Sequence, residues 1–143
     1  KTVANFLQYI DEQHYTNSLV HRVSTGFVVQ GGGYDVLYHE RQQNKPIFNE
    51  SGNGLKNEAY TIAMARENPP HSATNQFYFN MEDNESLDPG KSWGYAVFGM
   101  VMEGTEVLDL ISGAITHRNQ ELGWDEVPVK KITLKKIYIL PES

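Results

Sequence analysis

Apolar residues recur at helical spacing at the start of the chain and at strand-like spacing in most of the rest. Apolar side chains at positions 3, 6, 7 and 10 predict an amphipathic helix over residues 2–12, with Thr2 as a possible N-cap. A similar pattern over residues 105–111, ended by Gly113, predicts a second short helix.

Short apolar segments predict β-strands over much of the remaining chain. They cover residues 19–24, 27–30, 61–65, 75–80, 95–101 and 127–140, with a possible short piece at 46–48. We interpret residues 31–57 and 117–126, which are mainly polar, as loops. Several short strands with a helix near each end predict a mainly β fold: a closed barrel capped by two helices, in one domain spanning residues 1–143.

The hairpin at residues 19–33 places unusual side chains close together. Successive side chains of a strand point to opposite faces, so Arg22 shares a face with Val20 and Ser24. Val28 and Gln30 share a face of the second strand, and simple alternation puts Phe27 on the other. Two interpretations stay open on this evidence: an apolar pocket with one directed charge, or a core hairpin with a solvated arginine.

Composition excludes several classes of protein. Twelve basic and eighteen acidic residues give a net charge of −6, and no basic cluster is present, which argues against nucleic acid or an anionic membrane as partner. No window approaches the roughly 18 apolar residues that span a bilayer. The chain has no cysteine, so it has no disulfide, thiolate nucleophile or cysteine metal site.

Other catalytic constellations are not found in the sequence. No histidines are paired at metal-ligand spacing, and no serine lies in a nucleophile elbow. Gly31, Gly32 and Gly33 do not open a helix, so we interpret them as places where the backbone turns or approaches closely. We therefore expect no metal and no cofactor. An arginine among amides and aromatics suits binding of an apolar peptide and stabilisation of a twisted amide.

Residues 20–32, Val-His-Arg-Val-Ser-Thr-Gly-Phe-Val-Val-Gln-Gly-Gly, closely resemble the signature of the cyclophilins, a family of peptidyl-prolyl cis-trans isomerases. Further blocks at residues 62–66, 72–79 and 95–101 agree with the family in order and spacing, and residues 53–57 and 93–95 look most like bacterial single-domain members. The resemblance implies an eight-stranded antiparallel barrel capped by two helices, and proline-containing polypeptides as substrates. We expect a monomer.

The resemblance also implies roles for individual residues. Arg22 would be the catalytic cation, and Gln30 would orient it or hold the substrate. Phe27, with Val28, Tyr78 and Leu87, would wall the proline pocket. The remaining expected contacts are the backbone of Ala65 and Arg66 for the residues before the proline, Gln76 at the rim, and Tyr95 in a place where many eukaryotic members carry histidine.

Three departures from the family pattern change the expectations. Val28 replaces the usual Met, Tyr78 replaces a Phe, and Ser86 stands where a large aromatic normally lies, unless Trp93 fills that place. Because that aromatic helps the family bind cyclosporin, we expect weak cyclosporin binding with isomerase activity kept. The alternative is a cyclophilin-like peptide-binding or chaperone module with little catalysis.

Two further expectations concern the whole protein. Family members have an N-terminal strand hairpin before the first helix, and the sequence begins without it, so we expect a truncated sequence. Bacterial cyclophilins occur in the cytoplasm and the periplasm, and the cysteine-free composition slightly favours the periplasm.

Overall fold

The computed structural model describes residues 1–90 and 92–141, and its mainly β architecture with two helices agrees with the prediction. The helices are α1 (Thr2–Asp11) and α2 (Thr105–Ser112), with one 3-10 turn, η1 (Glu85–Leu87). The strands are β1 (Ser18–Ser24), β2 (Val28–Asp35), β3 (Thr61–Met64), β4 (Phe77–Asn80), β5 (Val97–Met100), β6 (Thr116–Asn119), β7 (Trp124–Pro128) and β8 (Ile132–Leu134).

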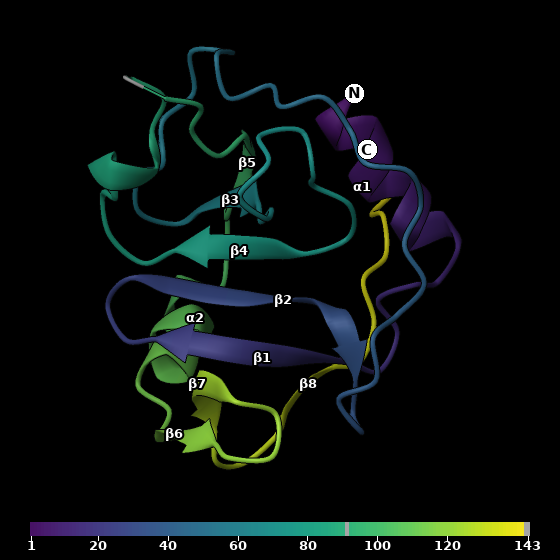
Figure 1. The fold of residues 1–143 in the computed structure, drawn as a ribbon, viewed down its shortest axis with the longest axis vertical. Coiled ribbons are helices and arrows are strands. Elements are labelled where there is room, and N and C mark those ends of the chain that lie inside the picture. The colour runs from purple at the N-terminus through teal and green to yellow at the C-terminus, as the bar shows by residue number, and fades with distance from the viewer. Residues whose placement is uncertain (91, 142–143) are drawn as a thin grey trace.

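The strands form two sheets rather than the predicted closed barrel. Six antiparallel strands lie in the order β5-β3-β4-β2-β1-β8, and β6 pairs with β7 in a separate sheet (Figure 1). Within the described residues the outer strands β5 and β8 are not hydrogen-bonded to each other, so the prediction of closure is wrong. No described residue bears on the hairpin expected before Lys1.

The prediction of one long strand over residues 127–140 is also wrong, because β7 ends at Pro128 and β8 begins only at Ile132. Thr116 pairs with Pro128, and Val129 N–H extends this ladder by one step to the Ile115 carbonyl at 2.9 Å. Residues 129 and 130 then bend the chain toward β8. The segment is therefore divided between β7 in the small sheet and β8 in the large one. The polar stretch 117–126, predicted to be a loop, supplies most of the β6–β7 hairpin.

The β1–β2 hairpin resolves the uncertain orientation of Phe27. Gly26 has a φ of +74° and Phe27 N–H bonds to the Ser24 carbonyl at 2.9 Å, so Phe27 belongs to the turn and β2 begins at Val28. Face alternation along the strand therefore does not apply to Phe27. The register pairs Arg22 with Gln30 and Ser24 with Val28, and its irregularities lie nearer the start of β1.

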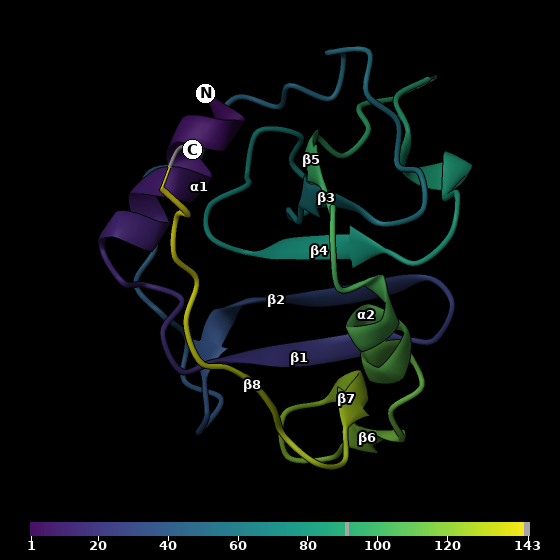
Figure 2. The same ribbon diagram turned by 180° about the vertical axis from the view of Figure 1, so that it is seen from behind.

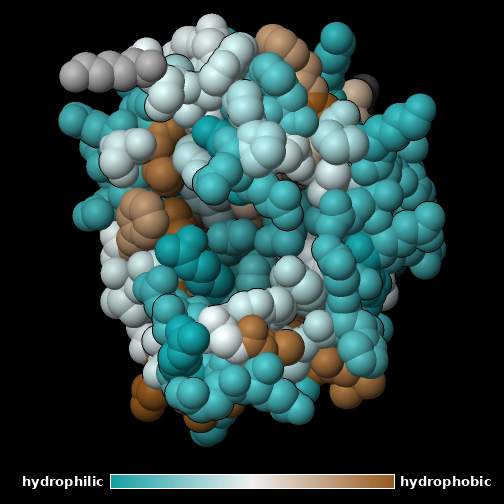
Figure 3. All heavy atoms as spheres, in the orientation of Figure 1, coloured by the Kyte–Doolittle hydropathy of each residue, from teal (hydrophilic) through white to brown (hydrophobic). Residues whose placement is uncertain are grey.

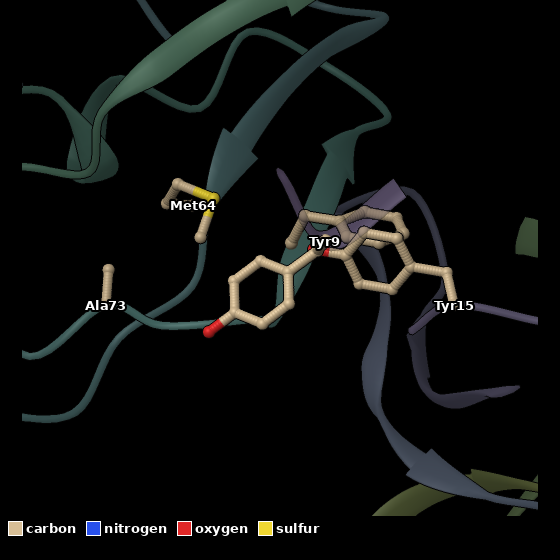
Figure 4. Close-up of a cluster of buried hydrophobic side chains, with 5 residues drawn as sticks. Tyr9, Tyr15, Met64 and Ala73 are labelled. Atoms are coloured by element: carbon tan, nitrogen blue, oxygen red, sulfur yellow. The ribbon is translucent and has the colours of Figure 1, made fainter. Parts of the chain in front are cut away.

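One hydrophobic cluster joins α1 to the sheet. Its buried residues are Tyr9, Tyr15, Met64, Ala73 and Phe77, which come from distant parts of the chain (Figure 4). Gly32 lets β2 approach this cluster, since a Cβ there would lie 2.8 Å from the Phe77 ring and 2.9 Å from the Tyr15 ring. In Figures 1 and 2, α1 lies beside one end of the sheet, next to the C-terminal segment.

A second cluster comprises Val28, Ala63, Ala65, Tyr78 and Val97. Helix α2 lies behind β1 and β2 in Figure 1 and in front of them in Figure 2. Its residue Ser112 accepts a hydrogen bond from Gly26 N–H at 3.0 Å, which ties α2 to the turn before Phe27. Neither helix of the described residues is long and apolar enough to cross a membrane.

Candidate active site

All of the predicted site residues except Gln76 line one cavity of about 190 Å³. These residues are Arg22, Phe27, Val28, Gln30, Ala65, Arg66, Tyr78, Leu87 and Tyr95. Gln76 lines a neighbouring cavity of about 260 Å³ that shares Gln30, Ala65 and Arg66 with the first. The face seen in Figure 3 is mainly hydrophilic and is hollowed near its middle, with hydrophobic residues gathered at one side of the hollow.

Strand register brings these side chains to one face. Gln30 of β2 lies opposite Arg22 of β1 on one side and opposite Tyr78 of β4 on the other. Directly paired residues point to the same face of a sheet, so their side chains stand in one row across three strands. Val28, two residues before Gln30, shares that face.

Polar side chains form a chain of contacts along this row. Arg22 Nη1 lies 3.5 Å from Gln30 Oε1, and Gln30 Nε2 donates to Gln76 Oε1 at 2.9 Å. On its other side, Arg22 donates from Nε and Nη2 to Glu126 Oε1, each at 3.3 Å. The Arg22 side chain keeps 38% of its surface exposed, so the guanidinium is anchored by neighbours and still reaches solvent.

The apolar wall of the cavity carries one buried hydroxyl. Tyr78 is 4% exposed, and its OH donates to Asn57 Oδ1 at 2.7 Å. Burial, with a smaller effect of Tyr95, raises the pKa of Tyr78 above its usual value, so the phenol stays neutral. The hydroxyl that distinguishes Tyr78 from phenylalanine thus has a partner behind the cavity wall.

The guanidinium of Arg66 is held in place by its neighbours. Its guanidinium lies 4.4 Å from the centre of the Tyr95 ring and donates to the carbonyls of Trp93 at 3.0 Å and Gly94 at 3.2 Å. Ala65 N–H is already engaged with the Gln76 carbonyl at 3.0 Å. Any backbone contact from Ala65 to a peptide would therefore use its carbonyl.

Two carboxylates lie in the neighbouring cavity. Glu40 and Glu67 line it together with the cation Arg66, and burial, with smaller effects of the two carboxylates, raises the pKa of Tyr34. Among the salt bridges of the described residues, neither carboxylate has a cationic partner. Over the same residues, no group of three or more His, Cys, Asp or Glu side chains could hold a metal ion.

Comparison with known proteins decides the family. The family described as "Cyclophilin type peptidyl-prolyl cis-trans isomerase/CLD" matches residues 1–139. This chain belongs to the cyclophilin family. The resemblance drawn from the sequence motifs is thereby confirmed.

Bacterial relatives of this cyclophilin are similar over most of their length. Peptidyl-prolyl cis-trans isomerase cyp18 of Streptomyces antibioticus is 44% identical, over 98% of this chain and 86% of the relative. Peptidyl-prolyl cis-trans isomerase B of Escherichia coli is 43% identical, over 95% of this chain and 87% of the relative. The activity named for these relatives and for the family is peptidyl-prolyl isomerisation, as the sequence predicts.

A solved structure supports the fold of this cyclophilin. A cyclophilin-type isomerase of Cryptosporidium parvum, crystallised in the presence of the dipeptide Ala-Pro, superposes with a TM-score of 0.80 and 22% identity. The alignment covers 99% of this chain and 86% of that one. At this level of identity the likeness supports the fold alone.

Two features of the cyclophilin site differ from the expectations. Trp93 is not among the described residues that line the cavity of about 190 Å³. Its ring packs against Phe48 and His71, with ring centres 5.7 and 4.8 Å away. Glu126 contacts Arg22 and was not predicted, because it lies 104 positions away in a stretch interpreted as loop. No local sequence signal could have revealed this contact.

Proposed function

We propose that this cyclophilin acts as a single domain over residues 1–143 and catalyses rotation about X-Pro bonds in unfolded or flexible proteins. The observation that carries the proposal is the placement of Arg22 and Gln30 opposite the apolar wall of a cavity of about 190 Å³. That volume is below the about 300–1,000 Å³ of typical sites for whole small molecules, and it suits a single side chain such as a proline ring.

The chemistry needs no covalent step. The barrier to rotation is about 20 kcal/mol and comes from amide resonance, which makes uncatalysed exchange take on the order of tens of seconds. An N–H of Arg22 directed at the prolyl nitrogen would stabilise the lone pair that appears when the amide twists. Because this hydrogen bond is stronger to the twisted amide than to the planar one, it would lower the barrier.

The other residues hold the substrate. Phe27, Val28, Tyr78 and Leu87 would enclose the proline ring, with Tyr95 at the edge of the same cavity. The residues before the proline would lie along Ala65 and Arg66, toward the second cavity with Gln76. This binding mode uses an apolar wall and a few directed polar groups, as small binding sites generally do.

We further propose a monomer that needs no metal or cofactor and binds neither nucleic acid nor membrane. The net charge of −6 supports the last two points. We also propose weak cyclosporin binding, because Ser86 on η1 is exposed and offers little apolar surface beside the cavity.

A protease-coupled assay on a proline-containing peptide tests the proposal. Arg22→Ala should lower kcat/KM by about a hundredfold, as expected when one directed donor to a transition state is removed. Arg118→Ala is the matched control, since Arg118 is exposed and pairs with Asp125 at 2.9 Å. If intact protein leaves the peptide at its uncatalysed rate, and Arg22→Ala changes nothing, the non-catalytic binding module is the better account.

A further inference from the structure

Arg22 has a second, unassigned partner in Glu126. The carboxylate of Glu126 takes hydrogen bonds from both Nε and Nη2 of Arg22, so it grips one edge of the guanidinium. Gln30 contacts the opposite terminal nitrogen, Nη1, at 3.5 Å. Within the described residues, these contacts leave one N–H on each terminal nitrogen for a substrate amide.

Glu126 sits in an unfavourable backbone conformation. Its φ is +60°, inside the strand β7, where a residue with a side chain rarely adopts the left-handed region. Such strain persists when the surrounding structure enforces it, and it gathers at functional sites. The neighbouring Asp125 points to solvent and pairs with Arg118, so the strained position is the one that faces the arginine.

The small sheet explains how the carboxylate reaches the site. β7 packs against β1, the strand that carries Arg22, while β7 itself pairs only with β6 among the described strands. In Figure 1 the β6–β7 hairpin lies at the edge of the large sheet, below β1. The hairpin thus brings a carboxylate to the side of Arg22 away from Gln30.

We propose that Glu126 is a positioning residue for Arg22. The inference rests on the proposed role of Arg22 in isomerisation. A long arginine side chain has many rotamers, and a catalytic donor is effective only when its direction is held. Glu126 holds that direction and does not touch the proline cavity, so it acts on kcat and leaves KM unchanged.

Glu126→Gly separates this role from a merely structural one. Glycine adopts a φ of +60° without strain, so the variant removes the carboxylate while relieving the backbone. We expect kcat to fall about fivefold, the upper range for a half-exposed ion pair, with unchanged KM and an unchanged or higher Tm. A structural role would instead lower Tm together with activity.

Three further variants sharpen the test. Glu126→Gln keeps an acceptor oxygen without the charge and should give an intermediate kcat. Asp125→Ala is the control for a lost carboxylate in the same strand, and Gln13→Gly is the control for strain relief, since Gln13 has a φ of +55° far from the site. Both controls should keep wild-type kcat.

Combining Glu126→Gly with Arg22→Ala separates the positioning role of Glu126 from the proposed isomerase function. If Glu126 acts through Arg22, adding Glu126→Gly there changes kcat no further. A folded Glu126→Gly protein with wild-type kcat overturns the positioning role while leaving the proposed function intact. An Arg22→Ala protein with wild-type kcat overturns the proposed function itself. Should Glu126→Gly fail to fold, Glu126→Asn, which also tolerates this backbone, gives the same readouts.

Discussion

His21, the neighbour of Arg22 on β1, should make the stability of the protein depend on pH. Its side chain is 9% exposed, and its Nδ1 has no hydrogen-bond partner among the described residues. Burial, with a smaller contribution from the charge of Arg22, lowers the pKa of His21 from 6.5 to about 4. The folded protein therefore holds this histidine neutral over a range in which the unfolded chain protonates it.

The sign and size of the effect follow from proton linkage. Between the two pKa values the unfolded chain binds more protons, so acidification favours unfolding. The stability that the folded protein gains by keeping His21 neutral is fully present above about pH 6.5. It is lost as the pH falls toward about 4. Between about pH 7 and pH 5 the loss amounts to about 2 kcal/mol in the free energy of unfolding.

Urea unfolding curves at several pH values measure this directly. His21→Phe keeps the ring contacts with Tyr34 and Trp124, whose centres lie 4.9 and 5.7 Å away, but cannot take up a proton. The variant should lose about 2 kcal/mol less than wild type over the same range. His117→Gln, at an exposed position of β6, is the control and should follow wild type. Equal pH dependence in wild type and His21→Phe would refute the reasoning.

Three other predictions concern the cavities. Tyr78→Phe removes the hydrogen bond to Asn57 and should lower the free energy of unfolding in urea by about 1 kcal/mol. Its kcat/KM should stay within about twofold of wild type, and a large loss of activity would give the hydroxyl a catalytic role. Cyclosporin should inhibit weakly and Ser86→Trp should tighten inhibition in a titration, an expectation that tight wild-type binding would contradict. Peptides with lysine two positions before the proline should be turned over about threefold faster than those with glutamate, because Glu40 and Glu67 line the second cavity. That preference should vanish in the double Glu→Gln variant and weaken in high salt.

Local patterns were enough to predict the helices and the strands near the site. Apolar spacing located α1 and α2 to within a residue or two, and the motif around Arg22 and Gln30 correctly indicated the family. The resemblance as a whole named the residues that line the cavity of about 190 Å³, although their roles stay predictions. These features are encoded over short stretches, where alternation and turn residues determine the backbone.

What the sequence could not show depends on contacts between distant segments. Strand β6 has no buried residue, and its residues 116–119 lack the alternation of apolar and polar side chains that marks a half-buried strand. The break after Pro128 and the open sheet follow from pairings that no local pattern specifies. The contact of Glu126 with Arg22 could not be predicted either, because it requires β7 to lie against β1.

The alternation of β1 links stability to the site. Leu19, His21 and Val23 are buried, while Arg22 on the opposite face keeps 38% of its side chain exposed. Protonating His21 would place a second cation beside Arg22, in a buried position where charge is costly. Acid should therefore strain the segment that holds the proposed catalytic group before the protein unfolds as a whole. Isomerase activity and unfolding free energy should then decline together as pH falls, and His21→Phe should weaken both declines.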